Sequence, residues 1–495
     1  MNLAMLLDMA ADAYGERRAV SCGGDSLTYA QLRATAQALA ARIASGGFGH
    51  VALLDTNGLA APIVLFASAY AGLPYVPLNY RLTQAELGEL LGRIAPAWLG
   101  LGPGFAATAV PPGISCAPAP CAGAAAPDSP AAAPEDPRAI AVQLFTSGTS
   151  GAPKAAVLRH ENVMAYILGT VEFGAAGEEE AALVAVPPYH IAGISALLSS
   201  TYGTRRIVML PSFDPAQWVQ LALAEGITHA FVVPTMLVRI IEHLEAQGAV
   251  RFPALRAIAY GGGKMPASVI ARALEMFPGV DFTNAYGLTE TSATICLLTP
   301  GDHREACASA DPRVRRRLGS VGKPLPTVEL QVRDEAGRVL GPEQSGLVFV
   351  RGGQVAGEYR GAGSLLDAQG WFATQDRGWS DAEGYLFLEG RADDVIVRGG
   401  ENISPGEIEE TLLAHPAVAD AVVVAVPSEQ WGEAVAAAVV LRPGGAVAAE
   451  ELRQWVRERL RSSRVPERIA FRSELPYNEL GKVLRRVIRQ ELAAA

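Results

Sequence analysis

The chain has 495 residues, of which 50% are hydrophobic and 19% are charged, and its formal net charge is -10. This length exceeds what one hydrophobic core supports, so we expect at least two domains, and the composition excludes wholesale disorder. The acidic balance argues against nucleic-acid binding, which requires a basic surface.

The beginning of the chain predicts an amphipathic helix. Leu3, Leu6, Leu7 and Ala10 fall on one helical face, Asp8 interrupts the apolar run, and no basic segment precedes it, so we expect no signal peptide. Five scattered cysteines without a C-x-x-C pair indicate free thiols and a reducing compartment. We therefore expect a cytoplasmic protein.

The next segments alternate between helix and strand. Thr28 and Gln31 form a capping box for a helix that ends at Gly46, and the almost continuously apolar run 51–55 then predicts a strand buried on both faces. The uncharged stretch 58–78 contains three prolines and predicts a buried helix running into a strand, without membrane insertion. Further apolar runs lie at 179–188, 205–211, 228–234 and 255–262. This alternation predicts an α/β fold with parallel-rich sheets and packed helices.

Two segments divide this pattern. Residues 102–136 are dominated by Ala, Pro and Gly, and we expect them to form a loose surface connection. A domain boundary is expected near 390–394, after which Ser404, Pro405 and Glu407 predict a capped helix start. A strand at 421–426, an apolar run at 434–441 and a charged helix at 449–462 follow. We expect a large domain at 1–391 and a small, mobile α+β domain at 392–495.

The segment 144–157 carries the strongest chemical signal. A predicted strand ends in small and hydroxylated residues, whose backbone N–H groups and hydroxyls suit phosphate oxygens, and a lysine adds charge. The candidate phosphate-binding residues are Thr146, Ser147, Gly148, Thr149, Ser150, Gly151 and Lys154. Pro153 and Ala155 stand where a P-loop needs glycine and Ser or Thr, so the segment is not a P-loop. Taken alone, it could equally be an ordinary Ser/Thr/Gly loop.

Seven further blocks accompany this loop. They lie at 187–193, 260–266, 284–291, 319–324, 371–376, 390–409 and 475–486. Together with the loop, their order resembles the acyl-adenylate-forming superfamily of acyl- and aryl-CoA synthetases, adenylation domains and luciferases. Among these, the chain is most similar to stand-alone acyl- or aryl-CoA ligases, and the resemblance covers nearly its whole length.

The resemblance implies ATP and Mg²⁺ as cofactors and assigns roles to residues in these blocks. Glu290 would bind Mg²⁺, Thr289 would contact the α-phosphate, and Lys482 would contact the acyl carboxylate and α-phosphate during adenylation. Asp376 and Arg391 would bind the ribose, and Tyr286 would stack on adenine. The remaining nucleotide-binding positions would be Gly261, Gly262, Gly263, Asn284, Ala285 and Gly287.

The resemblance also implies a second half-reaction. The small domain would rotate at a hinge near Asp393, after which Gly399 and Gly400 would face the pantetheine arm of the thiol substrate. Three positions depart from the family pattern: Ala155 and Gln375 replace glycines, and Lys264 replaces a proline.

The acid substrate is expected to be hydrophobic. No Asp stands near the expected pocket to pair with a substrate ammonium, and an unpaired buried ammonium would be costly. The expected lining is Ile191, Ala192, Ile194, Val232, Val233 and Met236, with His190 as a catalytic-site gate.

We therefore expect a carboxylic acid:CoA ligase that works through acyl-AMP. One open alternative transfers the acyl group to the phosphopantetheine of a carrier protein, and a second is a non-catalytic nucleotide-binding relative. The oligomeric state also stays open, with a homodimer among the alternatives.

Overall fold

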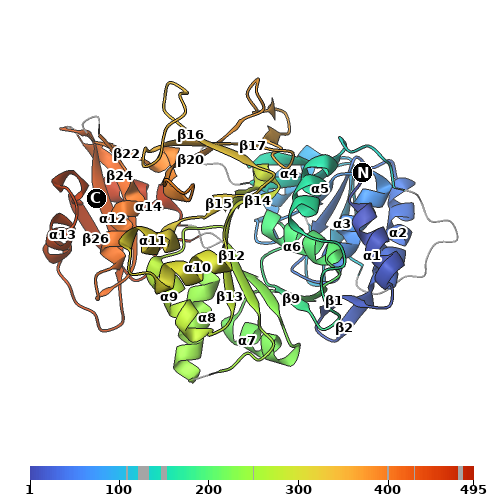
Figure 1. Cartoon of the computed structure of the whole chain (residues 1–495). Helices are drawn as coiled ribbons and strands as arrows, with labels where there is room; N and C mark the ends of the chain where they lie inside the picture. Colours follow the sequence, from blue (N-terminus) through green and yellow to red (C-terminus); the bar gives the residue numbers. More distant parts are fainter. Residues whose placement is uncertain are drawn as a thin grey trace.

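The structure is a computed structural model that describes residues 1–107, 110–120, 133–146, 153–248, 250–398, 401–428, 430–477 and 483–494. The chain runs from the α/β part at the right of Figure 1 to a small β-rich part at the left. The expected α/β class is confirmed, because parallel strands alternate with helices through the first 290 residues.

The first sheet has eight described strands in the order β19-β18-β8-β7-β4-β3-β5-β6. Its strands are β3 (His50–Leu54), β4 (Tyr75–Pro77), β5 (Ala97–Leu101), β6 (Ile114–Pro118), β7 (Ile140–Thr146), β8 (Lys154–Arg159), β18 (Glu358–Tyr359) and β19 (Gly363–Ser364). Strands β7, β4, β3, β5 and β6 are parallel, whereas β8 and β18 add antiparallel strands at one edge.

The second sheet has nine described strands in the order β15-β14-β13-β12-β11-β9-β10-β1-β2. Its strands are β1 (Arg18–Cys22), β2 (Asp25–Thr28), β9 (Ala181–Val184), β10 (Arg206–Met209), β11 (His229–Val232), β12 (Ala257–Gly261), β13 (Asp281–Leu288), β14 (Ala293–Leu298) and β15 (Lys323–Pro324). The strands from β1 to β13 in the middle of this order are parallel, so the four apolar runs predicted after residue 170 are confirmed as buried parallel strands.

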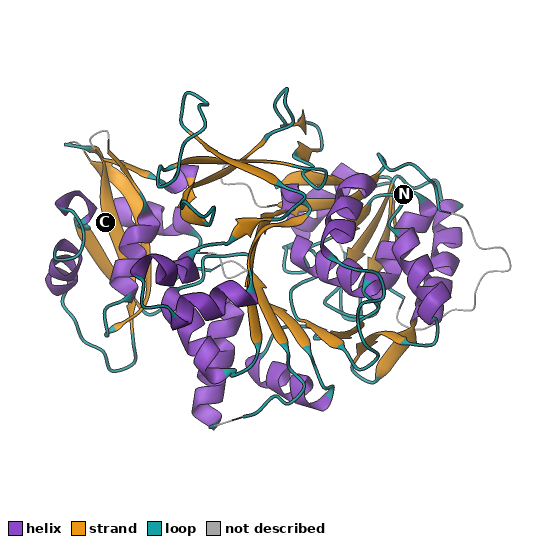
Figure 2. Ribbon diagram, in the orientation of Figure 1, coloured by secondary structure: helices purple, strands orange, loops and turns teal. Residues whose placement is uncertain are grey.

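Helices pack on both faces of the two sheets, and Figure 2 shows them grouped around the strands. The helices of this part are α1 (Ala4–Tyr14), α2 (Tyr29–Ala44), α3 (Ala60–Ala71), α4 (Gln84–Ile94), α5 (His160–Thr170), α6 (Ile191–Tyr202), α7 (Pro215–Ala224), α8 (Pro234–Gln247), α9 (Ala267–Met276), α10 (Pro300–Ala308) and the short α11 (Pro312–Arg315). In β3, Val51 and Leu53 pack against helices shared with the second sheet, whereas Ala52 and Leu54 pack against α4. Burial on both faces explains why residues 51–54 are all apolar.

The helix predictions in this part are confirmed. Leu6, Leu7 and Ala10 are buried on one face of α1, and Thr28 and Gln31 form the capping box of α2. The stretch 58–78 forms α3 and β4, both buried. No helix in the described ranges is long and apolar enough to cross a membrane.

A four-stranded antiparallel sheet follows, in the order β16-β17-β20-β21. Its strands are β16 (Glu329–Arg333), β17 (Gly346–Arg351), β20 (Phe372–Ser380) and β21 (Leu386–Arg391). It shares a hydrophobic cluster with Tyr286, Ile295 and Cys296 of the second sheet, so the two sheets are fixed relative to each other.

The last part of the chain forms its own five-stranded sheet. Its elements are β22 (Ile396–Arg398), β23 (Glu401–Ile403), α12 (Pro405–Leu413), β24 (Val418–Ser428), β25 (Gly432–Leu441), α13 (Ala449–Arg457), β26 (Arg468–Arg472) and α14 (Arg485–Ala494). Two hydrophobic clusters, one on each face of the sheet, are built from residues of this part alone. Short 3₁₀ turns occur at η1 (Thr289–Thr291), η2 (Arg316–Gly319), η3 (Ala392–Asp394) and η4 (Ser462–Arg464).

Three local predictions need correction. The connection 102–136 contains strand β6, which pairs in parallel with β5 and is therefore part of the sheet. The side chain of Ser404 does not cap α12, because its hydroxyl donates to the carbonyl of Glu389 at 2.7 Å. The charged helix α13 ends at Arg457, five residues before the expected end.

Candidate active site

The candidate site lies at the carboxyl edge of the second sheet. Because β9, β11, β12 and β13 are parallel, the segments that follow them emerge at one edge, where ligands of α/β sheets bind. These segments carry His190, Val233, Gly262 and Glu290, which are far apart in sequence. Four of the expected motifs are thus brought together by strand direction alone.

The carboxyl edge of the first sheet reaches the same place. Tyr80 follows β4, and its ring lies 5.4 Å from the ring of Tyr189, which follows β9. The His190 ring lies 4.5 Å from that of Tyr189, at the start of α6. His190 is partly buried, and its expected role as a gate stays a prediction.

Two glycines are required by the packing of this edge. A Cβ at Gly261 would lie 2.2 Å from the carbonyl oxygen of Ala285, and one at Gly287 would lie 1.7 Å from that of Ala293. The turn that Gly287 permits is tight, since Ser292 and Ala293 have φ values of 57° and 128°. Backbone strain of this kind is commonly stored at functional sites. The beginning of this turn is the segment that contains Thr289 and Glu290.

The acyl-side residues are apolar. Val232, Val233 and Met236 are buried, and a Cβ at Gly262 would lie 3.5 Å from Val233. Gly262 and Gly263 themselves are exposed. A bare backbone next to apolar side chains would offer a flat wall for a ligand, and the expected hydrophobic pocket stays a prediction.

Asp376 is the centre of a polar group on the four-stranded sheet. It pairs in register with Arg391, whose guanidinium Nη1 lies 3.2 Å from Asp376 Oδ1. The hydroxyl of Tyr286 donates to Asp376 Oδ2 at 2.6 Å. Burial would lower the pKa of Arg391, but the charge of Asp376 outweighs it and raises that pKa, so the guanidinium stays cationic.

Tyr286 and Asn284 are held more tightly than a ligand contact alone requires. The Tyr286 ring is 9% exposed within a hydrophobic cluster, and burial and Asp376 raise the pKa of its hydroxyl, which therefore remains a donor. The amide of Asn284 is buried and donates to the carbonyl of Ser320 at 3.1 Å. Their expected nucleotide contacts stay predictions.

Glu290 lies in η1 and is fixed by the segment that forms β18. The backbone N–H groups of Ala356 and Gly357 both donate to the Glu290 carbonyl at 2.9 Å. The hydroxyl of Tyr359 donates to Glu290 Oε1. Thr289 is the neighbouring residue of the same turn and is partly buried.

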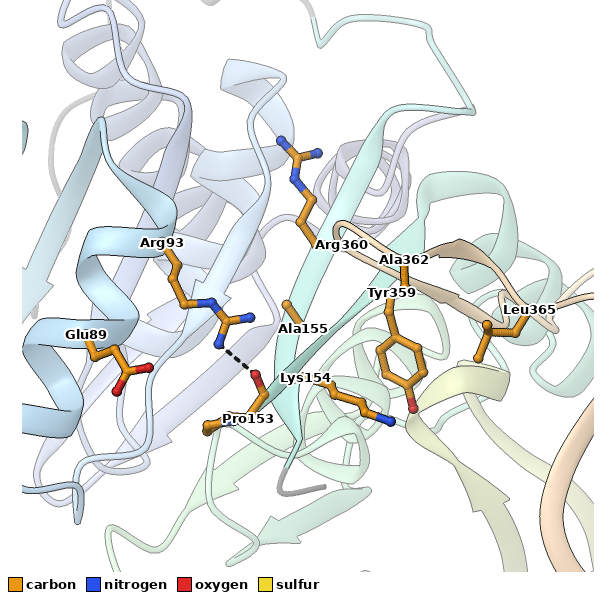
Figure 3. A pocket seen from close by; sticks show the side chains of 9 residues that line it. All are labelled: Glu89, Arg93, Pro153, Lys154, Ala155, Tyr359, Arg360, Ala362 and Leu365. Carbon is orange, nitrogen blue, oxygen red and sulfur yellow. Dashed lines mark hydrogen bonds between the residues drawn. The ribbon is translucent and has the colours of Figure 1, made fainter. Parts of the chain in front are cut away.

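Lys154 approaches the same tyrosine from the first sheet. Its ammonium lies 5.6 Å from the centroid of the Tyr359 ring, and Figure 3 shows the two side chains next to each other. Beside them is a cavity of about 370 Å³. It is lined by Glu89, Arg93, Pro153, Lys154, Ala155, Tyr359, Arg360, Ala362 and Leu365.

The donor set at Glu290 fits Mg²⁺ that is bound mainly through phosphate oxygens. In the described ranges no group of three or more His, Cys, Asp or Glu side chains could hold a metal ion. Mg²⁺ in phosphate-transferring sites uses one or two carboxylates, water and the substrate phosphates, so a single hard carboxylate beside Lys154 is sufficient. Glu290 is the candidate ligand.

Some expected site residues lie outside the described part of the chain. These are Ser147, Gly148, Thr149, Ser150, Gly151, Gly399, Gly400 and Lys482. The residues at either end of the phosphate segment are described: Thr146 and Lys154 pair between antiparallel strands β7 and β8. Tyr477 and Val483, on either side of 478–482, also pair with each other.

The three departures from the family pattern each have a structural counterpart. Ala155 is buried within β8, where a small side chain fits. Gln375 is exposed and has a φ of 63°, the left-handed conformation that glycine adopts freely. Lys264 lies 3.4 Å from both Glu410 Oε2 and the carbonyl of Gly406, on α12. Lys264 thus contacts helix α12 of the last part of the chain. No sequence signal indicated this contact.

Sequence reasoning did not find Tyr359. The residue is the second of the two residues of strand β18 (Glu358–Tyr359), and no periodic pattern surrounds it in the sequence. Its contacts with both Lys154 and Glu290 in the folded chain are what identify it as a candidate site residue.

Comparison with known proteins gives matches over nearly the whole chain. The model of a family described as AMP-binding enzyme matches residues 7–360, and one described as AMP-binding enzyme C-terminal domain matches residues 407–482. A 2-succinylbenzoate–CoA ligase of Bacillus cereus is 33% identical over 483 residues, which is 96% of this chain and 95% of the relative.

Solved structures agree with this similarity. The o-succinylbenzoate CoA synthetase of Bacillus subtilis, in complex with its acyl-adenylate intermediate, is 28% identical with a TM-score of 0.85, covering 98% of this chain and 97% of its own. The amide bond synthetase McbA of Marinactinospora thermotolerans is 29% identical with a TM-score of 0.86, covering 99% of both chains. ATP-bound MatB of Rhodopseudomonas palustris is 26% identical with a TM-score of 0.87, covering 100% and 99%.

Proposed function

The chain belongs to the AMP-binding enzyme family and is an acid–thiol ligase of the AMP-forming type, and from this premise we propose that it joins a hydrophobic carboxylic acid to CoA. The expected family resemblance is thereby confirmed. The proposal also covers the class of acid substrate, the acyl acceptor, and the residues that bind ATP and catalyse the reaction.

One observation carries the assignment of residues. Lys154, Glu290 and the Asp376–Arg391 pair come from different sheets or turns, yet Tyr359 contacts both Lys154 and Glu290, and the charge of Glu290 acts on Arg391. This linkage supports a common site at the edge where Gly262 lies. A cation and a hard carboxylate suit a triphosphate, whereas Asp376 suits a ribose diol. An apolar wall suits the rest of a carboxylic acid.

In the first half-reaction a carboxylate oxygen attacks the α-phosphorus of ATP, and pyrophosphate leaves. The reactants all carry negative charge, so Lys154 and Lys482 would neutralise it while Asp376 and Arg391 orient the ribose. Mg²⁺ bound at Glu290 would screen the phosphate charges. Thr289 would donate to the α-phosphate, and the product is a mixed acyl–AMP anhydride.

In the second half-reaction the thiol sulfur of CoA attacks the acyl carbon and displaces AMP. A thiol with a pKa near 8.5 is only a few per cent thiolate at neutral pH, about 3% by the titration relation, but an acyl phosphate is activated enough to react. We propose that Asp393 acts as the hinge between a large domain at 1–391 and a small domain at 392–495, so that Lys482 withdraws before CoA enters.

The acid is inferred from the apolar residues and from the relatives. The 2-succinylbenzoate ligases make an aryl acid the first to test, and the buried Val233 and Met236 favour a hydrophobic body over a short dicarboxylate. CoA is favoured as acceptor over a carrier protein because the curated relatives are named CoA ligases.

The test is carboxylate-dependent ATP–pyrophosphate exchange with a panel of acids. We expect exchange with 2-succinylbenzoate, benzoate or a medium-chain fatty acid to exceed that with malonate by at least about 10-fold, the discrimination expected from a few buried methylenes. Activity with malonate alone would overturn the hydrophobic acid. Exchange with no acid, despite ATP binding, would favour the non-catalytic alternative.

The acceptor is tested with the best acid. CoA, a phosphopantetheinyl carrier protein and a primary amine are offered to preformed acyl-AMP, since one structural relative is an amide bond synthetase. Fastest consumption with CoA supports the proposal. Asp376→Asn should lose exchange, whereas Glu335→Gln, an exposed carboxylate next to β16, should retain it.

A further inference from the structure

Tyr359 contacts two groups that the proposed chemistry assigns to the triphosphate. Its hydroxyl donates to Glu290 Oε1, and its ring lies beside the Lys154 ammonium. Glu290 is 69 residues away in sequence, and Lys154 is in a different strand. Neither residue is a sequence neighbour of Tyr359, so the tertiary structure creates both contacts.

The backbone around Tyr359 reinforces both contacts. Tyr359 pairs in register with Ala156 of β8, and the N–H of Arg360 donates to the carbonyl of Ala155 at 2.8 Å. The N–H groups of Ala356 and Gly357 donate to the Glu290 carbonyl. The segment 356–360 therefore connects the strand that begins with Lys154 to the turn that contains Glu290.

A partly buried ion pair secures this segment on β8. The Arg159 guanidinium donates through two nitrogens to Glu358, with distances of 2.8 and 2.7 Å. Such bidentate pairs give geometric specificity. The residues on either side of Tyr359, Glu358 and Arg360, are therefore both bonded to β8.

The hydroxyl contact restricts the orientation of the Glu290 carboxylate, because Oε1 accepts from Tyr359. The carboxylate has further lone pairs, so it would still be able to bind a phosphate-bound cation. Groups that hold a metal-binding carboxylate in place typically change metal affinity about 10- to 100-fold when removed. A ring beside an exposed ammonium has a smaller effect, about 2- to 5-fold.

We propose that Tyr359 is a positioning residue that holds the Glu290 carboxylate for Mg²⁺ and the Lys154 ammonium for the phosphates at a fixed separation. This rests on the proposed function, in which both residues act on ATP. Tyr359 itself contacts no reacting atom in this assignment.

The proposal is tested by ATP binding, measured calorimetrically with and without Mg²⁺, so that the readout does not depend on turnover. Tyr359→Phe keeps the ring and removes the hydroxyl. We expect the Mg²⁺-dependent gain in ATP affinity to fall about 10- to 100-fold, with metal-free ATP affinity changed less than about 2-fold. Tyr359→Leu should in addition weaken metal-free ATP binding about 2- to 5-fold.

Tyr385→Phe is the matched control. Tyr385 also donates to a carboxylate, at 2.6 Å from Asp302 Oδ1, but lies away from Lys154 and Glu290 in the chain and in contacts. It should leave both affinities unchanged while showing the same loss of thermal stability as Tyr359→Phe.

Glu290→Gln separates the failure of this inference from that of the proposed function. If Glu290→Gln abolishes the Mg²⁺-dependent gain and Tyr359→Phe does not reduce it, the positioning role is overturned. If Glu290→Gln leaves the gain intact, the metal assignment is overturned and Tyr359 loses its role with it. Equal weakening of metal-free and metal-bound ATP by Tyr359→Phe would also overturn the proposal.

Discussion

The large region, residues 1–391, and the small region, residues 396–494, differ in how their side chains are held together. In the large region a single cluster joins helices to both parallel sheets, and a second joins the four-stranded sheet to β14. In the described ranges no hydrophobic cluster contains residues of both regions. The small region is therefore a self-contained core.

Polar contacts join the two regions in the described ranges. Ser404 donates to the carbonyl of Glu389, and Lys264 lies 3.4 Å from Glu410 and from the Gly406 carbonyl. Polar surface contacts contribute little to stability, whereas shared apolar cores contribute much. We therefore propose that the groups assigned to ATP binding are held in place by the core of the large region, and that the small region would change orientation at low cost.

The largest expected effect comes from removing the lysine that the small region would supply. Lys482→Ala should slow acyl-AMP formation more than about 100-fold, because one charge-stabilising donor is lost from the first transition state. Thioester formation from supplied acyl-AMP should change less than about 3-fold by the same reasoning. The two half-reactions are measured separately in single turnover.

Arg486→Ala is the control for Lys482→Ala, since Arg486 is an exposed cation on α14. It should leave both half-reactions near the wild-type rates. Equal loss of both in Lys482→Ala would mean that the small region does not contribute separately to adenylation.

The second effect concerns the connection between the regions. Asp393 lies in the 3₁₀ turn η3, and Asp393→Pro would force Ala392 away from its helical conformation. Proline also fixes φ near about -65°, so one orientation should be favoured. We expect thiol transfer to slow about 10- to 100-fold while acyl-AMP forms within about 3-fold of wild type, as for a mutation that impedes a conformational step.

Asp393→Ala removes the same side chain without stiffening the backbone, and it should leave thiol transfer much closer to wild type. If both half-reactions of a folded Asp393→Pro protein slow together, the comparison between a fixed and a movable region fails.

The third effect is acid sensitivity, which should be confined to the large region. His160 is buried and accepts a hydrogen bond from the Leu3 N–H at 3.2 Å. Burial, with the N-terminal amino group adding to it, lowers the pKa of His160 from 6.5 to about 4. The unfolded chain therefore binds a proton between pH 6.5 and 4 that the folded chain does not, so stability is lost as the pH falls through this window.

By pH 5 this single histidine should cost about 2 kcal/mol of the free energy of unfolding. His160→Gln should remove that part of the pH dependence, whereas His415→Gln in the small region should not. Hydrogen exchange at pH 7 and pH 5 should show earlier loss of protection in α1 and α5 than in β24 and β25. Earlier loss in the small region would contradict the comparison.

The smallest effect tests the contact between the regions. Lys264→Met should expose the connection 392–395 more often, because the pair with Glu410 is half-exposed and contributes about 0.2–1 kcal/mol. Limited proteolysis of this connection should accelerate by no more than about 5-fold. Glu410→Gln should act alike, and the double variant should add little if the two side chains are one contact. If the effects of the two substitutions on the proteolysis rate were strictly additive, Lys264 and Glu410 would not act as one contact.

Much of the fold followed from local pattern. The run 51–55 predicts a doubly buried strand because its first four residues are all apolar, and Thr28 with Gln31 predicts a helix start because both partners are within one turn. The same kind of local pattern predicts the Ser/Thr/Gly segment before Lys154 and the ordered blocks that carry Glu290, Asp376 and Arg391. Such signals are contained within a few neighbouring residues.

The contacts that connect these blocks depended on tertiary structure. The Tyr286 hydroxyl reaches Asp376 across 90 residues, Tyr359 reaches Glu290 across 69, and Lys264 reaches Glu410 across 146. Nothing in the sequence near one partner specifies the other, because each pair is created by strand order and by the packing of separate sheets. The sequence alone determined the family, the α/β class and most of the candidate residues, and the tertiary structure decided which of them touch.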